Sequence, residues 1–332
     1  MIHSLTTQAR RSVAPVVLAA AALLGSSAQA LTINATFVDV GDGAFNAASM
    51  AVVNQAIAFY ENTFSDNVTV NIQFHNDHDF FGGSLAFRST QSYAGAYRGA
   101  LIADSSSADD ATAVASLPSN LVFGTNLSVK SALGRAVGLN TPGGAIFYND
   151  PNNGGLFCNF TGDGCIGLDL ANTGASLIAV VEHEINEVLG LGSGLSGTSR
   201  GTEEPEDLFR FLNGARTYQA NSSTTNGCGA GSSRAFFSVD GGATNLNEFN
   251  NCNNGGDYGD WITHNPSQVQ DAFTDQQGVP SMTLSSTETR ALDVIGWTMT
   301  TQTRTLPEPG TLGLLGLALL AAAASRRRRD PA

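Results

Sequence analysis

The sequence is short of basic residues and lacks the motifs of several enzyme classes. Lys and Arg account for 16 of the 332 residues, against 29 Asp and Glu. This balance makes nucleic acid and anionic membrane surfaces poor partners, because both attract basic proteins. There is no P-loop for a nucleotide phosphate, and no nucleophile elbow supports Ser/His/Asp catalysis. The function must therefore be sought in other chemistry.

The first 30 residues have the pattern of a secretory signal peptide. Arg10 and Arg11 supply a positive start, Val13–Leu24 is a short apolar run, and the small-x-small sequence at 28–30 suits cleavage. A membrane anchor is the less favoured alternative, because the run is well short of the ~20 residues that a span needs. We expect residues 1–30 to be removed on export.

The C-terminal end of the sequence carries three features in a fixed order. Pro307-Glu308-Pro309 precedes the apolar run Thr311–Ala324, and four arginines, Arg326–Arg329, follow. Such a run is a candidate transmembrane helix whose arginines stay in the cytoplasm. Residues 306–332 resemble the PEP-CTERM sorting signal of Gram-negative bacteria. The resemblance implies recognition by an exosortase and delivery to the cell surface or the extracellular space, whereas the alternative is a plain C-terminal anchor.

Residues 31–305 remain as one domain, or as one domain with a small subdomain. They contain 10 basic and 27 acidic residues, which gives a net charge of −17. Its four cysteines suit an oxidising compartment, and their spacing does not match a zinc knuckle. Three pairings are open. We favour the local pairs, Cys158 with Cys165 and Cys228 with Cys252.

The hydrophobic pattern predicts an α+β fold. Alternation of apolar and polar residues predicts strands, and longer amphipathic periods predict helices. The segment from 213 to 260 is expected to be loop-rich. The expected strands are 31–40, 68–74, 84–87, 144–148 and 235–239, and the expected helices are 45–64, 93–103, 108–117 and 287–295. We expect strand 144–148 to be an edge strand before the stretch 176–190.

The stretch 176–190 carries the strongest chemical signal. At 3.6 residues per turn it forms a helix with an apolar stripe on one side, made of Leu177, Val181, Ile185 and Val188. His183 and Glu187 are four residues apart on the other side, so both can bind one metal ion. Glu184 lies beside them and can act as a base toward water at that ion. The alternative is a solvated acidic face with an incidental histidine.

This stretch resembles the His-Glu-x-x-His helix of zincin metallopeptidases, with Glu187 in place of the second histidine. The order of blocks from His183 to Trp297 also resembles secreted bacterial metallopeptidases that carry a C-terminal sorting tag. The later blocks are Glu206-Asp207-Leu208-Phe209-Arg210, Phe237-Ser238-Val239-Asp240-Gly241-Gly242, Asp257-Tyr258-Gly259-Asp260-Trp261 and Leu292-Asp293-Val294-Ile295-Gly296-Trp297. The resemblance implies a zincin-like domain with an N-terminal mixed sheet, a catalytic helix and a loop-rich C-terminal part, acting on peptides or proteins through Zn²⁺. In zincins an edge strand before the catalytic helix holds the substrate backbone, so the resemblance also implies that strand 144–148 lines the functional cleft.

A zinc site needs a third protein ligand. Asp207 follows Glu187 by 20 residues, close to the separation of the acidic ligand in thermolysin-like zincins, and is our first choice. The competing candidates are Glu203, Glu204, Glu206 and the more distant His264. Met282 is a candidate for a methionine below the metal, although ordinary packing is the favoured interpretation.

Two further interpretations stay open. The segment 75–79 contains two histidines and two aspartates, but a polar turn is favoured over a metal site there. Loops at 150–154 and 163–164 have the composition of calcium loops without the EF-hand pattern, so structural Ca²⁺ is a second cofactor candidate. The competing hypothesis for the whole chain is a non-catalytic surface or matrix protein on a zincin-like scaffold.

Overall fold

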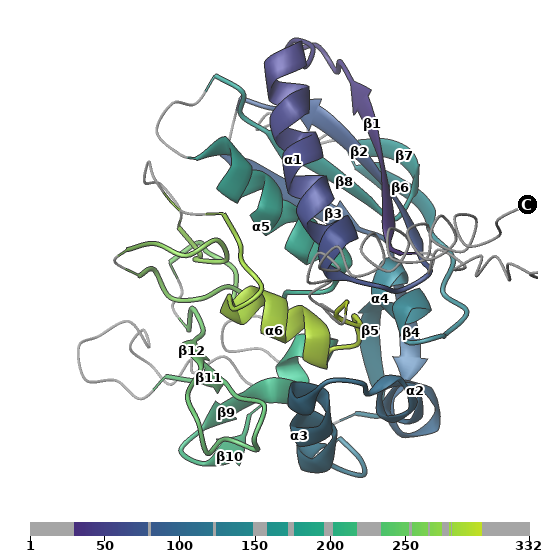
Figure 1. Cartoon of the computed structure of the whole chain (residues 1–332), viewed down its shortest axis with the longest axis vertical. Coiled ribbons are helices and arrows are strands. Elements are labelled where there is room, and N and C mark those ends of the chain that lie inside the picture. The colour runs from purple at the N-terminus through teal and green to yellow at the C-terminus, as the bar shows by residue number, and fades with distance from the viewer. Residues whose placement is uncertain are drawn as a thin grey trace, which may run out of the picture.

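The computed structural model describes most of the chain from residue 30 to residue 300 (Figure 1). The residues that it describes are 30–78, 81–121, 124–148, 158–171, 176–195, 202–217, 234–251, 254–264, 266–273, 279 and 281–300. The predicted signal peptide, the apolar run Thr311–Ala324 and the predicted pair of Cys228 with Cys252 lie outside these residues. Within the described ranges, none of the helices combines the length and apolar character needed to cross a bilayer.

A four-stranded mixed sheet forms the N-terminal half. Its order is β1 (Thr32–Val38), β2 (Thr69–Asn76), β8 (Gly164–Leu168) and β3 (Gly82–Ala86). The first three strands are parallel, and β3 pairs antiparallel with β8 at the edge. The mixed sheet predicted for this half is confirmed, and with the helices described below the fold is α+β.

Two helices cover one face of this sheet (Figure 1). Helix α1 (Ala47–Thr63) connects β1 to β2 and begins at Asn46, whose side chain accepts from two backbone N–H groups in a capping box. Helix α5 (Leu177–Leu189) lies beside α1 and against β3 and β8. The Tyr60 hydroxyl joins the two helices through a 2.7 Å hydrogen bond to the carbonyl of Glu182. The sheet and α1 thus hold α5 rigidly in place.

The segment between β3 and residue 144 forms the lower part of the structure as drawn in Figure 1. Strand β4 pairs antiparallel with β5, and short helices surround the pair. In chain order the elements are β4 (Arg88–Ser92), a π-helical turn (Tyr93–Tyr97), α2 (Arg98–Asp104), α3 (Ala108–Ser116), β5 (Asn126–Lys130) and α4 (Ser131–Ala136). The helices predicted at 93–103 and 108–117 are confirmed, the first as a π-helical turn that continues into α2.

Among its described residues, the C-terminal half has little regular structure, as predicted. A small antiparallel sheet has the order β10-β9-β11-β12. Its members are β9 (Arg210–Leu212), β10 (Ala215–Arg216), β11 (Phe236–Phe237) and β12 (Asn247–Glu248), preceded by the 3-10 turn η2 (Pro205–Phe209). The last helix, α6 (Thr287–Val294), confirms the prediction, whereas the strand predicted at 235–239 is only the two residues of β11. Trp261 and Trp297 are fully buried, so this half shares a real core.

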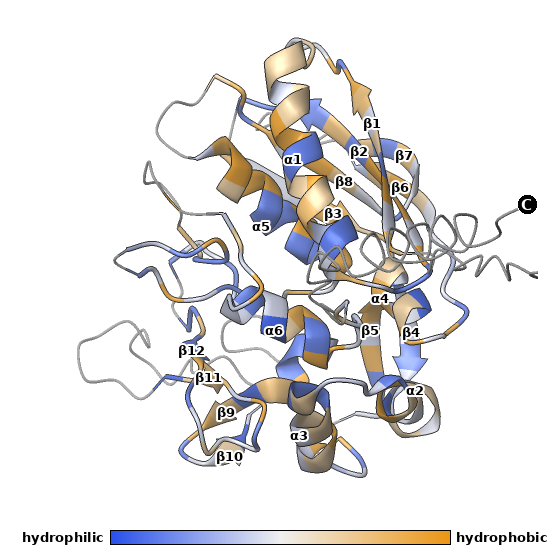
Figure 2. Cartoon of the chain, in the orientation of Figure 1, coloured by the Kyte–Doolittle hydropathy of each residue, from blue (hydrophilic) through white to orange (hydrophobic). Residues whose placement is uncertain are grey.

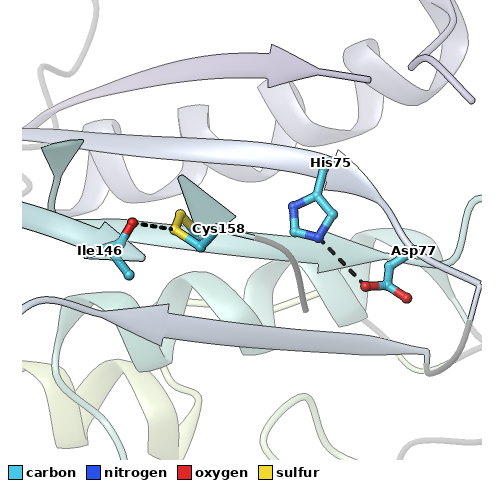
Figure 3. Close-up of a disulfide and its surroundings, with 5 residues drawn as sticks. His75, Asp77, Ile146 and Cys158 are labelled. Atoms are coloured by element: carbon cyan, nitrogen blue, oxygen red, sulfur yellow. Dashed lines mark hydrogen bonds and ion pairs between the residues drawn. A yellow bond between two sulfur atoms is a disulfide. The ribbon is translucent and has the colours of Figure 1, made fainter. Parts of the chain in front are cut away.

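The strand predicted at 144–148 is present, but it is not part of the four-stranded sheet. It is β6 (Gly144–Tyr148), which pairs with β7 (Cys158–Gly162) in a separate two-stranded sheet. The edge strand that lies against α5 is β3, so the expectation that β6 lines the cleft is corrected. The disulfide Cys158–Cys165 joins β7 to β8 and confirms the predicted local pair (Figure 3).

Candidate metal centre

The two faces of α5 differ as the sequence predicts. Val181 and Ile185 are fully buried in the core and Val188 is 1% exposed, while Leu177 packs at its margin. Figure 2 shows hydrophobic and hydrophilic positions on the same helix. The helix ends at Gly190 with a φ of 145°, a conformation that favours glycine. His183 and Glu187 are only partly buried, so their side chains remain available to a ligand.

His183, Glu187 and Asp260 come together as the one group of three potential ligands found among the described residues. One ligand atom from each lies within 4.8 Å of the others. His183 Nε2 is 3.9 Å from Glu187 Oε1 and 3.7 Å from Asp260 Oδ1. The helix therefore supplies two of the three groups, and a loop 73 residues after Glu187 supplies the third.

The histidine ring is held by its other nitrogen. His183 Nδ1 lies 2.9 Å from the carbonyl oxygen of Val269, which can only accept a hydrogen bond. Nδ1 therefore carries the proton and donates, and in the neutral ring Nε2 is left with its lone pair toward the two carboxylates. This is the arrangement by which a backbone carbonyl usually fixes a metal-binding histidine.

The cluster concentrates negative charge. Burial opposes the charge on His183, but the carboxylates around it, Asp260 first, outweigh burial and raise its pKa to about 10. Burial raises the pKa of Asp260 to about 7, and Glu187 and Asp257 add to this effect. Several carboxylates thus lie close together, and the imidazolium of His183 is the positive charge among them that offsets their repulsion. A divalent cation would relieve this repulsion.

Glu184 lies beside the cluster, between α5 and the edge strand β3. Its side chain is close against Gly82, where an added Cβ would come within 2.7 Å of Glu184 Oε1. The residue is only 5% exposed, and burial, followed by the charge of Glu187, raises the pKa of its carboxyl group well above the usual range. A carboxyl group in such a setting is a good proton acceptor once a cation offsets the nearby charge.

Hydrogen bonds fix both acidic members of the cluster. Ser84 on β3 donates from its hydroxyl to Glu187 Oε2 at 2.5 Å. Gln270 donates from its amide nitrogen to Asp260 Oδ1 at 3.0 Å. The carboxylates are therefore oriented before any ligand arrives.

Asp207, our first choice from the sequence, does not belong to this group. It is fully buried in the turn η2, where Oδ1 accepts from the Ser193 hydroxyl at 2.7 Å and from Arg210 Nε at 3.3 Å. Oδ2 accepts from the backbone N–H of Glu204 at 2.9 Å. Both oxygens thus stabilise the turn, and the structure brings Asp260 to His183 and Glu187 in its place.

The other acidic candidates are also engaged elsewhere. Glu204 forms ion pairs with Arg88 and with Lys130, the latter at 3.6 Å. Glu206 accepts a hydrogen bond from the backbone of Gly192. Glu203 is buried and outside the group as well. The segment 203–207 therefore organises the turn after α5.

His264 lies outside the group of three potential ligands, and Met282 packs against α5 and α1. His264 Nδ1 is 2.6 Å from Asp271 Oδ1. Met282 is 5% exposed, and its sulfur lies 3.2 Å from Asn186 Nδ2 and 3.5 Å from the Tyr60 hydroxyl. These contacts are those of a packed core methionine, the interpretation favoured from the sequence.

The segment 75–79 does not form a second metal cluster among its described residues. His75 is fully buried on β2, with Nε2 3.6 Å from Asp77 Oδ2 (Figure 3). His78 is largely exposed and pairs with Asp169 at 3.3 Å. The two histidines therefore face different surroundings, as expected for a polar turn at a strand end.

The sequence does not predict that Asp260 joins His183 and Glu187, because no spacing rule reaches it. It belongs to the block Asp257-Tyr258-Gly259-Asp260-Trp261, which enters the sequence analysis only through the resemblance. The weak signal in the sequence is that Asp260 directly precedes Trp261, because a tryptophan is usually well buried and anchors the backbone beside it. Choosing it over the nearer carboxylates required the fold.

Comparison with known proteins identifies one feature. A protein-family model described as "PEP-CTERM protein-sorting motif" matches residues 305–329. Exosortase recognises this motif during sorting, so the chain is an exported bacterial protein directed to the cell surface. No curated protein and no solved structure matches the chain.

Proposed function

We propose that this exported protein is a metal-dependent peptidase of zincin-like type on the surface of a Gram-negative bacterium. His183, Glu187 and Asp260 would hold the ion, and Glu184 would be the general base. The observation that carries the proposal is the convergence of one imidazole and two carboxylates within 4.8 Å, beside a third buried carboxylate.

The donor set suits a divalent ion in both distance and chemistry. Two donors about 2.1 Å from a zinc ion lie roughly 3.4 Å apart at the tetrahedral angle. The distances from His183 Nε2 to the two carboxylates, 3.9 and 3.7 Å, need only small adjustments to reach this arrangement. Nitrogen and carboxylate oxygen are both accepted by zinc, although two carboxylates also suit Mn²⁺ or Ca²⁺.

An ion in this site would polarise the carbonyl of a peptide bond and make a neighbouring water more acidic. The Glu184 carboxylate would take a proton from that water as the water oxygen bonds to the carbonyl carbon, and would give the proton to the amide nitrogen as the C–N bond breaks. Val269 would keep the imidazole of His183 in the required tautomer through its carbonyl. Two anionic ligands leave less positive charge on the ion than three imidazoles do, so we expect modest rates.

Strand β3 would supply the substrate-binding edge. It is the antiparallel edge of the main sheet, it lies against α5, and it contributes Ser84 to Glu187. An extended peptide could add to this edge by backbone hydrogen bonds, which is how edge strands commonly hold peptides. The substrate class follows from this placement as an extended peptide or protein segment.

The replacement Glu184→Gln tests the proposal. It keeps the shape of the side chain and removes its capacity to take a proton. We expect proteolysis of an unstructured protein such as casein to fall by roughly 10²–10⁴-fold with metal content unchanged. Proteolysis that persists at the wild-type rate would contradict the role of Glu184.

A second candidate function is a non-catalytic surface protein with a structural cation. The two carboxylate ligands favour it, because they suit hard ions that stabilise extracellular folds. In that case a purified protein would contain metal and be destabilised by chelation, yet neither the wild type nor Glu184→Gln would cleave peptides.

A further inference from the structure

A buried chain of amide groups leads from the helix pair to the loop carboxylate of the metal cluster. Asn186 on α5 donates from Nδ2 to Gln270 Oε1 at 3.0 Å. Gln270 donates from Nε2 to Asp260 Oδ1 at 3.0 Å. Asn186 and Gln270 are completely buried, so water does not compete for these groups.

The direction of each amide is determined by its neighbours. The carboxylate of Asp260 can only accept, so the nitrogen of Gln270 is the end that faces it. The oxygen of Gln270 then accepts from the amide nitrogen of Asn186. Asn186 Oδ1 is left facing the Tyr60 hydroxyl at 2.8 Å, whose single proton it shares with the carbonyl of Glu182.

The backbone of Gln270 is held as firmly as its side chain. Its N–H donates to Glu288 Oε1 at 3.2 Å, and its carbonyl accepts from the backbone N–H of Trp261 at 2.8 Å. Trp261 follows Asp260 directly in the chain. The loop that carries Asp260 and the residue that orients its carboxylate therefore move as one unit.

We propose that Gln270 is a positioning residue that sets the direction of the Asp260 carboxylate toward the metal site. The inference rests on the proposed metal centre. The oxygen that accepts from Gln270 is Oδ1, the same atom that lies 3.7 Å from His183 Nε2. Gln270 thus connects α5 by hydrogen bonds to Asp260, which lies 73 residues after Glu187 in the sequence. Removing such a partner of a metal ligand weakens metal binding by roughly 10–100-fold.

The test compares Gln270→Met with Gln268→Met in the purified exported protein. Methionine has nearly the shape of glutamine but cannot donate to Asp260. Gln268 lies in the same loop, and its Oε1 accepts from Asn247 Nδ2 at 2.7 Å, away from the cluster. Zinc affinity is measured by competition with a chromophoric chelator, and thermal unfolding is recorded on the metal-free proteins.

We expect the affinity for zinc to fall about 10–100-fold in Gln270→Met and to stay within about twofold in Gln268→Met. A purely structural role would instead lower the unfolding temperature of the metal-free Gln270 variant and leave its zinc affinity unchanged. Gln270→Glu serves as a second variant, because its carboxylate still accepts from Asn186 while it repels Asp260. It should lose at least as much zinc affinity.

The outcomes separate the two proposals. If the wild type binds zinc and both Gln270 variants bind it equally well, the positioning role is overturned and the metal centre stands. If the wild type binds none of the divalent ions Zn²⁺, Mn²⁺ and Ca²⁺, the metal centre is overturned, and the role of Gln270 with it.

Discussion

Asp66 provides a sharp test of the packing between α1 and the end of the described chain. It is 8% exposed and accepts a hydrogen bond from the backbone N–H of Thr298 at 2.9 Å. Burial raises its pKa to about 7, and the nearby Asp104 adds to the rise, while the bond from Thr298 opposes it. We predict that Asp66→Asn stabilises the protein near pH 8 and has little effect near pH 4.

The sign follows from proton linkage. Between the unfolded pKa of about 4 and the folded pKa of about 7, the folded protein binds more protons at Asp66 than the unfolded chain does. The free energy of unfolding therefore falls as pH rises through this window and is level above it. A difference of about three pH units corresponds to about 4 kcal/mol at most, and we expect about half of that because water reaches the site in part.

Urea unfolding of the wild type and Asp66→Asn at pH 4, 5.5 and 8 measures the effect. Asparagine keeps an oxygen that can accept from Thr298, so the variant should gain about 2 kcal/mol at pH 8. Asp66→Ala should gain about 1 kcal/mol less, because the Thr298 N–H loses its partner. A variant that is no more stable at pH 8 than at pH 4, relative to the wild type, would refute the reasoning.

Two further predictions concern contacts that hold α5 and the neighbouring strands in place. Tyr60→Phe should lower the free energy of unfolding by about 1–3 kcal/mol, because it removes the hydroxyl that bonds to the carbonyl of Glu182 and to Asn186. A urea unfolding curve that matches that of the wild type would contradict this prediction. Replacing Cys158 and Cys165 by serine opens a short loop, for which chain entropy predicts a loss of about 2.5 kcal/mol, seen as a lower melting temperature. An unchanged melting temperature would contradict this loss.

The helix motif could be predicted from the sequence because its chemistry is local. The spacing of His183 and Glu187 places them on one face, and the apolar stripe through Val181 and Ile185 turns that face outward. A single helix contains the whole pattern, so no tertiary information is needed.

Strand β8 could not be predicted in the same way. Gly164–Leu168 is short, contains two glycines and is buried on both faces, so it shows no alternation. Its glycine at 164 is needed by the fold, because an added Cβ would come within 2.7 Å of Val188 on α5. The pattern that identifies strands is thus absent where the packing is closest.

The third member of the candidate metal cluster could not be predicted from the sequence for a related reason. Asp207 lies at a plausible distance along the chain, but Arg210 and Ser193 hold its carboxylate within the turn η2. Asp260 reaches the cluster through loop pairing that no local propensity encodes. Chain separation is a poor guide when several carboxylates compete.

The most direct test of the metal centre is elemental analysis of the purified exported protein beside two variants, Asp260→Asn and Asp207→Asn. Circular dichroism first establishes that both variants are folded. The account predicts near-stoichiometric zinc in the wild type and in Asp207→Asn, and its loss in Asp260→Asn. Metal that is absent from the wild type, or that is kept by Asp260→Asn and lost from Asp207→Asn, would contradict it.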